Sequence, residues 1–184
     1  MEKLVIDTET TGLSCYANKV LTVGLLLVDV EKDFLEILDE SHICVRHENY
    51  RVDPAAFEVH KIDLEKHDKV GVPVKDACLQ INDFVLKNEV LKTPVLGHNV
   101  SFDRGFLNSL FIQGNVEPKI SNVSVDTMHL WNSLKKRGVV PFNLRSNLGT
   151  VANFFGVDYG GAHDALEDCK ITAKVYQGIL ELEK

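Results

Sequence analysis

Two acidic side chains lie close together near the start of the chain, in the hexapeptide Asp7-Thr8-Glu9-Thr10-Thr11-Gly12. Residues 3–8 have the apolar pattern of a buried strand, and the threonines and glycine that follow are typical of a turn. Because side chains alternate between the two faces of a strand, Asp7 and Glu9 project from the same face. Two carboxylates about 4 Å apart repel by about 4 kcal/mol at an effective dielectric constant of about 20. A proton or a cation is therefore expected between them, although the same residues are also compatible with a simple turn cap.

Three further polar residues, Asp103, His163 and Asp168, lie at the starts of predicted helices. Asp103 falls in a first helical turn, a position that the helix dipole favours in any protein. Asp164 and Glu167 have the spacing of a capping box, so the last helix is predicted to begin there. On one continuous helix His163 and Asp168 would be about 140° apart. On a loop that precedes the helix, His163 can face the same site as Asp168, but a solvent-facing histidine beside a surface acid fits this segment equally well.

The placement of these residues depends on the strands and helices around them. Three strands are predicted first, as an antiparallel meander, and strands then alternate with helices, which indicates an α/β fold with a mixed central β-sheet flanked by α-helices. The predicted strands cover residues 3–8, 20–29, 34–45, 93–97 and 122–125. The predicted helices cover residues 74–87, 102–111, 128–134, 148–155 and 164–184. With no internal repeat or linker, residues 1–184 are expected to form a single domain.

The four acids and the histidine are expected to converge, because the ends of strands gather on one side of an α/β sheet. Four carboxylates and one imidazole form a site rich in hard oxygen ligands, which suit Mg²⁺ or Mn²⁺ better than zinc. Two such ions about 3.5 to 4 Å apart would hold the acids together and bind the attacking and leaving oxygens of a phosphodiester. A histidine that titrates near neutral pH is suited to act as general base for the attacking water.

Charge and composition restrict the class of protein. Twenty Lys and Arg against 27 Asp and Glu give a net charge of −7, so contacts to nucleic acid would need local positive patches or metal ions. The longest apolar run, residues 21–28, is too short for a membrane-spanning helix, and no leader segment is visible. The four cysteines are widely separated, and His42, Cys44 and His47 have no partner cluster, which disfavours zinc and favours a reduced, cytoplasmic location.

Three sequence motifs carry a resemblance to a known family. Asp7 to Gly12, then Asn99 with Phe102 and Asp103, then His163 with Asp168, resemble the three exonuclease motifs of the DEDDh (DnaQ-like) 3′–5′ exonucleases. The motifs occur in the family's order, and the similarity extends over almost the whole chain. Within this family, the chain is similar to the epsilon proofreading subunit of bacterial DNA polymerase III. Tyr159 does not have the spacing of the family's tyrosine branch, so the chain resembles the histidine branch.

The resemblance implies a ribonuclease H-like fold, two Mg²⁺ or Mn²⁺ ions, and hydrolysis from the 3′ end that releases nucleoside 5′-monophosphates. By motif position, the metal ligands would be Asp7, Glu9, Asp103 and Asp168, and His163 would be the general base.

The resemblance also implies a group of residues that contact the substrate. These are Thr8, Thr10, Gly12, Leu13, His60, Asn99 and Phe102. Leu13 would wedge against the last base and Phe102 would pack near its sugar. Lys61, next to His60, stands where family members often have glycine.

These inferences favour a metal-dependent 3′–5′ exonuclease acting on single-stranded 3′ ends, with DNA favoured over RNA. Two alternatives stay open: an exoribonuclease resembling ribonuclease T or oligoribonuclease, and a non-catalytic nucleic-acid-binding adaptor of the replisome. A DNA polymerase is a candidate partner and a membrane is not. The chain ends directly after its last predicted helix, which favours a free-standing enzyme over a tethered proofreader. Lys135-Lys136-Arg137 is compatible with a solvated helix end or with contacts to phosphates beyond the cleavage site.

Overall fold

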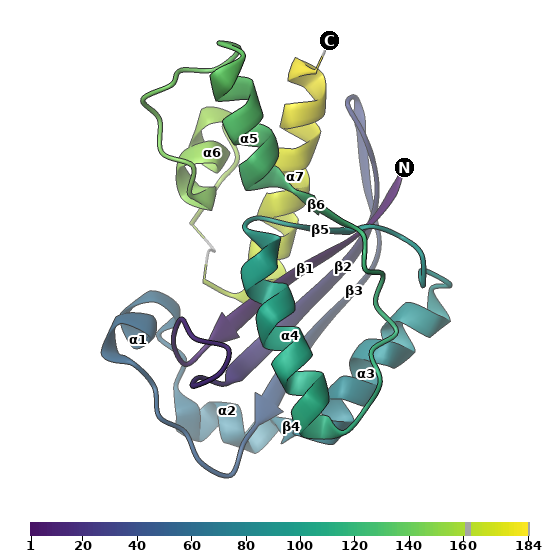
Figure 1. Ribbon diagram of the computed structural model, residues 1–184, viewed down its shortest axis with the longest axis vertical. Coiled ribbons are helices and arrows are strands. Elements are labelled where there is room, and N and C mark those ends of the chain that lie inside the picture. The colour runs from purple at the N-terminus through teal and green to yellow at the C-terminus, as the bar shows by residue number, and fades with distance from the viewer. Residues whose placement is uncertain (161–162, 184) are drawn as a thin grey trace.

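A six-stranded mixed β-sheet with the strand order β4-β3-β2-β1-β5-β6 forms the centre of the molecule (Figure 1). The computed structural model describes residues 1–160 and 163–183, so the last residue of the final predicted helix lies outside the described residues. The strands are β1 (Glu2–Thr10), β2 (Val20–Glu31), β3 (Phe34–Arg46), β4 (Val72–Pro73), β5 (Val95–Gly97) and β6 (Ser124–Asp126). The predicted α/β fold with a mixed sheet is confirmed.

The pairing directions bring three strand ends to one edge of the sheet. β1 pairs antiparallel with β2, and β2 pairs antiparallel with β3, as the predicted meander requires. β1 pairs in parallel with β5, and β5 pairs in parallel with β6. The carboxyl ends of β1, β5 and β6 therefore lie side by side, where the chain leaves each strand for the next segment.

Helices cover both faces of this sheet (Figure 1). The helices are α1 (Pro54–His60), α2 (Leu64–Val70), α3 (Val74–Lys87), α4 (Val100–Gly114), α5 (Thr127–Lys136), α6 (Leu148–Phe154) and α7 (Ala165–Leu182). One core cluster joins β1 and β2 to α3 and α4, and a second joins the opposite face to α7. A third cluster packs α5 and α6 against α7. None of the helices in residues 1–160 and 163–183 has the length and hydropathy that a membrane crossing requires.

Alternation along β1 determines which helix each later side chain faces. Leu4 and Ile6 belong to the core cluster with α3 and α4, whereas Val5 belongs to the cluster with α7. Continuing this period of two, Asp7 and Glu9 point toward the α7 side of the sheet. The intervening Thr8 therefore points toward α4.

Two short helices and a short strand were not predicted. α1 and α2 have seven residues each, and their only fully buried side chains are His60 and His67. Each helix has only about two turns and one buried histidine, so neither contains an apolar stripe. The sequence pattern between β3 and α3 therefore resembles a loop. The two-residue β4, which pairs with the end of β3, is likewise too short for a periodic signal.

Replacing Lys61 with glycine is expected to raise the free energy of unfolding by about 0.5 to 1 kcal/mol. Lys61 ends α1 in the left-handed region, with φ 51°, where a side chain is strained and glycine is not. Urea denaturation followed by circular dichroism would measure the change. Lys61→Ala retains the strained Cβ and should give little gain; an equal gain in both variants would contradict the strain argument.

Candidate active site

The end of β1 presents Asp7 and Glu9 at the sheet edge. The pairing register with β2 shifts after Glu9, which lies opposite Thr22, whereas Thr10 lies opposite Val20. Bulges of this kind end regular pairing and redirect side chains, and they are frequent beside active sites. Glu9 is buried and Asp7 is half-buried, so both carboxylates are removed from much of the solvent that would screen their repulsion.

The turn after β1 is held together by close packing around Gly12. A Cβ built on Gly12 would lie 2.1 Å from Asp53 Oδ2 and 2.4 Å from Asn18 Nδ2, so a larger residue would force these side chains apart. The Thr10 hydroxyl donates to the Gly12 carbonyl at 2.7 Å. These contacts fix the path of the main chain beside Glu9.

α4 brings Asp103 to the same edge, in the predicted first turn of a helix. Thr8 Oγ1 donates a hydrogen bond of 2.8 Å to Asp103 Oδ1, and both side chains are buried. This contact links β1 to α4 directly beside Asp7. The hydrogen of the Thr8 hydroxyl is donated to Asp103.

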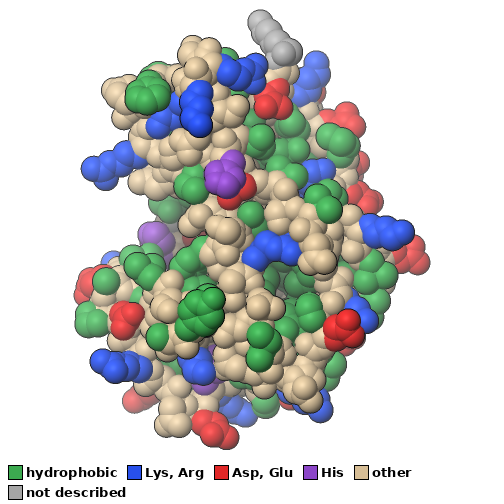
Figure 2. Space-filling view, viewed as in Figure 1, with side chains coloured by type: hydrophobic (Ala, Val, Ile, Leu, Met, Phe, Trp, Pro, Cys, Tyr) green, Lys and Arg blue, Asp and Glu red, His purple; other side chains and the backbone are tan. Residues whose placement is uncertain are grey.

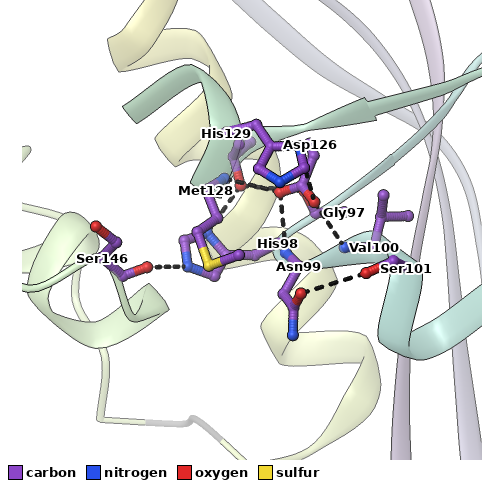
Figure 3. Close-up of polar contacts among 10 residues, drawn as sticks. Gly97, His98, Asn99, Val100, Ser101, Asp126, Met128, His129 and Ser146 are labelled. Carbon is purple, nitrogen blue, oxygen red and sulfur yellow. Dashed lines mark hydrogen bonds and ion pairs between the residues drawn. The ribbon is translucent and has the colours of Figure 1, made fainter. Parts of the chain in front are cut away.

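Asp126, the last residue of β6, joins the starts of two helices (Figure 3). Its carboxylate oxygens accept the backbone N–H groups of Asn99 at 3.0 Å and Val100 at 3.1 Å, at the start of α4, and of Met128 at 2.9 Å in α5. These bonds hold Asn99 in a left-handed conformation, with φ 66°. The Asn99 side chain turns away from Asp126 and accepts a hydrogen bond from Ser101 Oγ at 3.4 Å.

α7 begins close against β2 because Gly24 places no side chain between them. A Cβ on Gly24 would lie 2.3 Å from the carbonyl oxygen of Ala165. Asp164 caps the helix, as predicted, by accepting the N–H groups of Leu166 at 3.1 Å and Glu167 at 3.3 Å. The Glu167 carboxylate instead accepts a bond from Lys170 Nζ at 3.0 Å, so only the Asp164 half of the predicted capping box is observed.

His163 and Asp168 meet Glu9 at this point. The backbone N–H of His163, which has φ 75°, donates to Asp168 Oδ2 at 3.2 Å. Potential ligand atoms of Glu9, His163 and Asp168 all lie within 4.8 Å of one another. Asp168 Oδ1 is buried and accepts no hydrogen bond from residues 1–160 or 163–183. A buried carboxylate oxygen without a donor is costly, so this atom is a point where a cation fits.

The pKa values of these carboxyl groups express the crowding of negative charge. Burial and the charges of Asp103 and Asp168 raise the pKa of Asp7 well above its usual value. Burial, followed by the charge of Asp168, raises the pKa of Glu9 to about 8. Burial raises the pKa of Asp103 to about 7, although the hydrogen bond from Thr8 lowers it. The pKa of Asp168 is also raised by burial, against the bond from the backbone N–H of His163.

The residues expected to contact substrate lie in different environments. Leu13 is 87% exposed, whereas Phe102 is half-buried with its ring centroid 4.8 Å from that of Phe106. His60 is only 7% exposed; its Nδ1 accepts the Ile62 N–H at 2.9 Å, and its buried Nε2 has no partner in the described part of the chain. Burial lowers the pKa of His60, which favours the neutral ring, and because Nδ1 accepts the Ile62 N–H, a neutral ring carries its proton on Nε2.

Tyr159 is a residue at the site that sequence reasoning did not assign to it. Its ring packs edge-on against His163, with centroids 5.9 Å apart, and its pKa is raised to about 12 by burial and then by the charge of Asp168. A Cβ on Gly149 of α6 would lie 2.9 Å from this ring, so the backbone of α6 packs closely against Tyr159. The tyrosine comes from a segment with no regular pattern, and no signal in the sequence indicates this contact.

A mixed sheet with four acids and a histidine at one edge defines the DEDDh class of 3′–5′ exonucleases. Residues 4–176 match the model of the RNase_T exonuclease family, and the chain belongs to this family. The resemblance inferred from the three motifs is confirmed.

Curated relatives include much longer polymerases. DNA polymerase III PolC-type of Streptococcus pyogenes serotype M18 (strain MGAS8232) is 27% identical over 176 residues, which are 94% of this chain and 11% of the relative. The PolC-type protein of Streptococcus pneumoniae serotype 2 (strain D39 / NCTC 7466) has the same identity and coverage. The chain thus spans about a tenth of the length of these relatives.

Solved structures share the fold at lower identity. Exonuclease I of E. coli, in complex with a dT13 oligonucleotide, matches 96% of this chain and 40% of its own, with a TM-score of 0.79 and 18% identity. The nuclease domain of 3′hExo, a DEDDh family member bound to rAMP, matches 98% of this chain and 92% of its own, with the same TM-score and identity. The predicted ribonuclease H-like fold is therefore confirmed.

Replacing Gly24 with alanine is expected to lower the free energy of unfolding by about 1 to 3 kcal/mol. The added methyl group would collide with the backbone of Ala165, push the start of α7 away from β2 and displace Asp168 from Glu9. Urea denaturation measures the stability, and degradation of a labelled single-stranded oligonucleotide measures the accompanying loss of activity.

The matched control for this variant is Gly105→Ala, within α4. A Cβ at Gly105 would come no closer than 3.4 Å to Cys15 Sγ, so alanine should be neutral or stabilising there. If both variants behave alike, close packing at Gly24 does not position α7.

The protein without metal is expected to lose stability as the pH rises from about 5 to about 8. The raised pKa values mean that the folded state retains protons that the unfolded chain has released. The stabilisation by these retained protons is fully present below the pKa values of the unfolded chain. It is lost as the pH rises through the pKa values of the folded state, about 7 for Asp103 and about 8 for Glu9. Thermal unfolding in EDTA across this range measures the effect.

Glu9→Gln removes one of these titrating groups and should flatten the pH dependence. Addition of Mn²⁺ at pH 8 should raise the unfolding temperature of the unaltered protein, because a ligand that binds only the folded state stabilises it. The prediction is contradicted if the unfolding temperature in EDTA stays constant or rises with pH. It is also contradicted if the unfolding temperature of Glu9→Gln falls with pH as steeply as that of the unaltered protein.

Proposed function

We propose that this exonuclease domain hydrolyses the terminal phosphodiester bond at single-stranded 3′ ends of DNA and releases nucleoside 5′-monophosphates. The observation that supports the proposal best is the unpartnered, buried oxygen of Asp168 within reach of Glu9 and His163. An acidic cluster of this kind, with an imidazole at its edge, is suited to water attack on a phosphodiester.

The donor set fits two divalent cations, Mg²⁺ or Mn²⁺. We assign Asp7, Glu9, Asp103 and Asp168 as ligands, because carboxylate oxygens are the ligands that these ions prefer. When bound, the ions polarise the phosphodiester and lower the pKa of the attacking water. Their positive charge also favours the ionised forms of carboxyl groups whose pKa values are raised by burial.

His163 is proposed as the general base. Its backbone N–H is held by Asp168 and its ring rests against Tyr159, while the side chain is exposed. In this position the imidazole takes a proton from the attacking water and passes it to bulk solvent. The fixed backbone and the aromatic contact keep the ring oriented without burying it.

The terminal nucleotide is proposed to lie between the turn after β1 and the start of α4. The main chain at Glu9 and Thr10 would hold the 3′-hydroxyl, Gly12 would also contact the substrate, and the exposed Leu13 would wedge against the last base. The unpartnered Nε2–H of His60 is a donor suited to the substrate. We also assign contacts to Thr8 through its main chain, and to Asn99 and Phe102.

DNA is favoured as substrate because the curated relatives are named DNA polymerases and exonuclease I binds a deoxyribonucleotide oligomer. The same relatives make a DNA polymerase a candidate partner. The exoribonuclease alternative is supported by 3′hExo, which is bound to rAMP. The presence of all five motif residues argues against the adaptor alternative, and a cytoplasmic location stays a prediction.

Incubation with labelled DNA and RNA oligomers of one sequence, with Mg²⁺, Mn²⁺ or EDTA, tests the proposal. We expect stepwise shortening of the DNA from its 3′ end, and no shortening in EDTA. Asp7→Asn should abolish hydrolysis, and His163→Gln should lower kcat by about 10² to 10⁴-fold. Faster shortening of the RNA would favour the exoribonuclease, and intact oligomers with metal supplied would favour the adaptor.

Glu167→Gln is the matched control, because Glu167 lies one residue before Asp168 but binds Lys170. It should retain activity within a few-fold. Asp7→Asn removes one of the repelling carboxylates and should not destabilise the metal-free fold, which separates lost chemistry from lost structure. Unchanged turnover in Asp7→Asn would overturn the assignment of the site.

A further inference from the structure

Positive charge is concentrated in one part of this acidic protein. Residues 127–157, here called the basic cap, contain α5, α6, their connection and the three residues after α6. The basic cap holds four Lys and Arg and no Asp or Glu, so the remaining chain carries 16 Lys and Arg against 27 Asp and Glu. In Figure 2, Lys and Arg side chains gather at the upper left of the molecule, where Figure 1 has α5 and α6.

Three of these cations are available to a ligand. Lys136, Arg137 and Arg145 are exposed, and their side chains have no ion pair or hydrogen bond within the described part of the chain. Lys135 has a different role, because its Nζ donates to the Leu144 carbonyl and to Ser146 Oγ and so braces the connection.

An exposed aromatic ring accompanies these charges. Phe142 is 77% exposed, and Lys135 Nζ lies 5.7 Å from its ring centroid. The ring and the lysine line one hollow together with His129, Asn132, Ser133 and Lys136. Cations beside an exposed aromatic face are the combination with which proteins bind single-stranded nucleic acid without sequence preference.

The basic cap adjoins the acidic site. His98, which precedes Asn99, contacts the carbonyl oxygen of Ser146 through Nε2 at 2.8 Å (Figure 3). Gly149 of α6 packs against Tyr159, and Tyr159 packs against His163. A single strand of nucleic acid that leaves the acidic site on the side of Tyr159 and α6 therefore reaches the basic cap next.

We propose that the basic cap binds the backbone of the single strand upstream of its 3′ end, through Lys136, Arg137, Arg145 and Phe142. This inference rests on the proposed function. Two divalent cations carry four positive charges, which the four carboxylate ligands balance, so the site itself leaves no surplus charge for further phosphates. A chain with a net charge of −7 must attract those phosphates through a local patch, and the basic cap is such a patch.

The test compares substrates of increasing length. In the variant Lys136→Ala/Arg137→Ala/Arg145→Ala, kcat/KM for a thymidine dinucleotide should be unchanged, because this substrate occupies the catalytic site alone. For an oligothymidylate of about 20 nucleotides, kcat/KM should fall about 10- to 100-fold at about 0.1 M salt, and the slope of log affinity against log salt should decrease by about 2. Phe142→Ala should weaken binding of the oligomer about tenfold and leave the salt slope unchanged.

The control variant is Lys69→Ala/Lys92→Ala/Lys119→Ala, which removes the same charge from exposed positions outside the basic cap. It should retain activity on the long oligomer within about twofold. Equal losses in the two triple variants, or an equal loss on the dinucleotide and the long oligomer, would overturn the inference. Thermal unfolding of each variant verifies that the fold is retained.

Binding measurements separate this inference from the proposed function. Fluorescence anisotropy of a labelled oligothymidylate, with Asp7→Asn as the parent protein, reports binding without hydrolysis. If the unaltered protein hydrolyses no oligomer but the basic-cap substitutions still weaken binding, the proposed function fails and the binding surface stands. If binding does not depend on the basic cap, the inference fails whatever the activity.

Discussion

Repulsion among buried carboxyl groups is the constraint on which this structure depends. Asp7, Glu9, Asp103 and Asp168 come from β1, α4 and α7, and the pKa of every one is raised chiefly by burial. Placing such groups together costs free energy that the rest of the fold must offset. The core clusters on both faces of the sheet do so, since each packs one of the acid-bearing helices against β1 or its neighbours.

The acids cannot easily move apart, because each bearing element is held by a contact close to the site. Thr8 fixes Asp103 to β1, and the absent side chain of Gly24 lets α7 start directly on β2. Asp126 holds the start of α4 to the end of β6 through two backbone N–H groups. The carboxyl groups are therefore held close together by ordinary hydrogen bonds and packing, and potential ligand atoms of Glu9 and Asp168 already lie within 4.8 Å of each other.

Local chemistry determines how much of this arrangement the sequence predicts. The shared face of Asp7 and Glu9 follows from strand alternation, and the start of α7 follows from the cap at Asp164, because both depend on residues that are close in sequence. The hydrogen bonds between Asp126 and the start of α4 cannot be predicted in this way, because they depend on the pairing of β5 with β6. α1 and α2 escape prediction because each buries a histidine in place of an apolar stripe.

The distribution of charge separates the chemistry of the site from the holding of its substrate. Carboxylates concentrated at one sheet edge repel phosphate unless cations neutralise their charge. A neutralised site exerts no long-range attraction on phosphate. Attraction must then come from a surface that contains no acid, and α5, α6 and their connection form the longest acid-free stretch of the chain. Because α5 and α6 pack on α7 through their own apolar cluster, charge on their outer surface can vary without disturbing the buried acids. In this arrangement, affinity for the single strand and the reactivity of the site depend on different residues of the same fold.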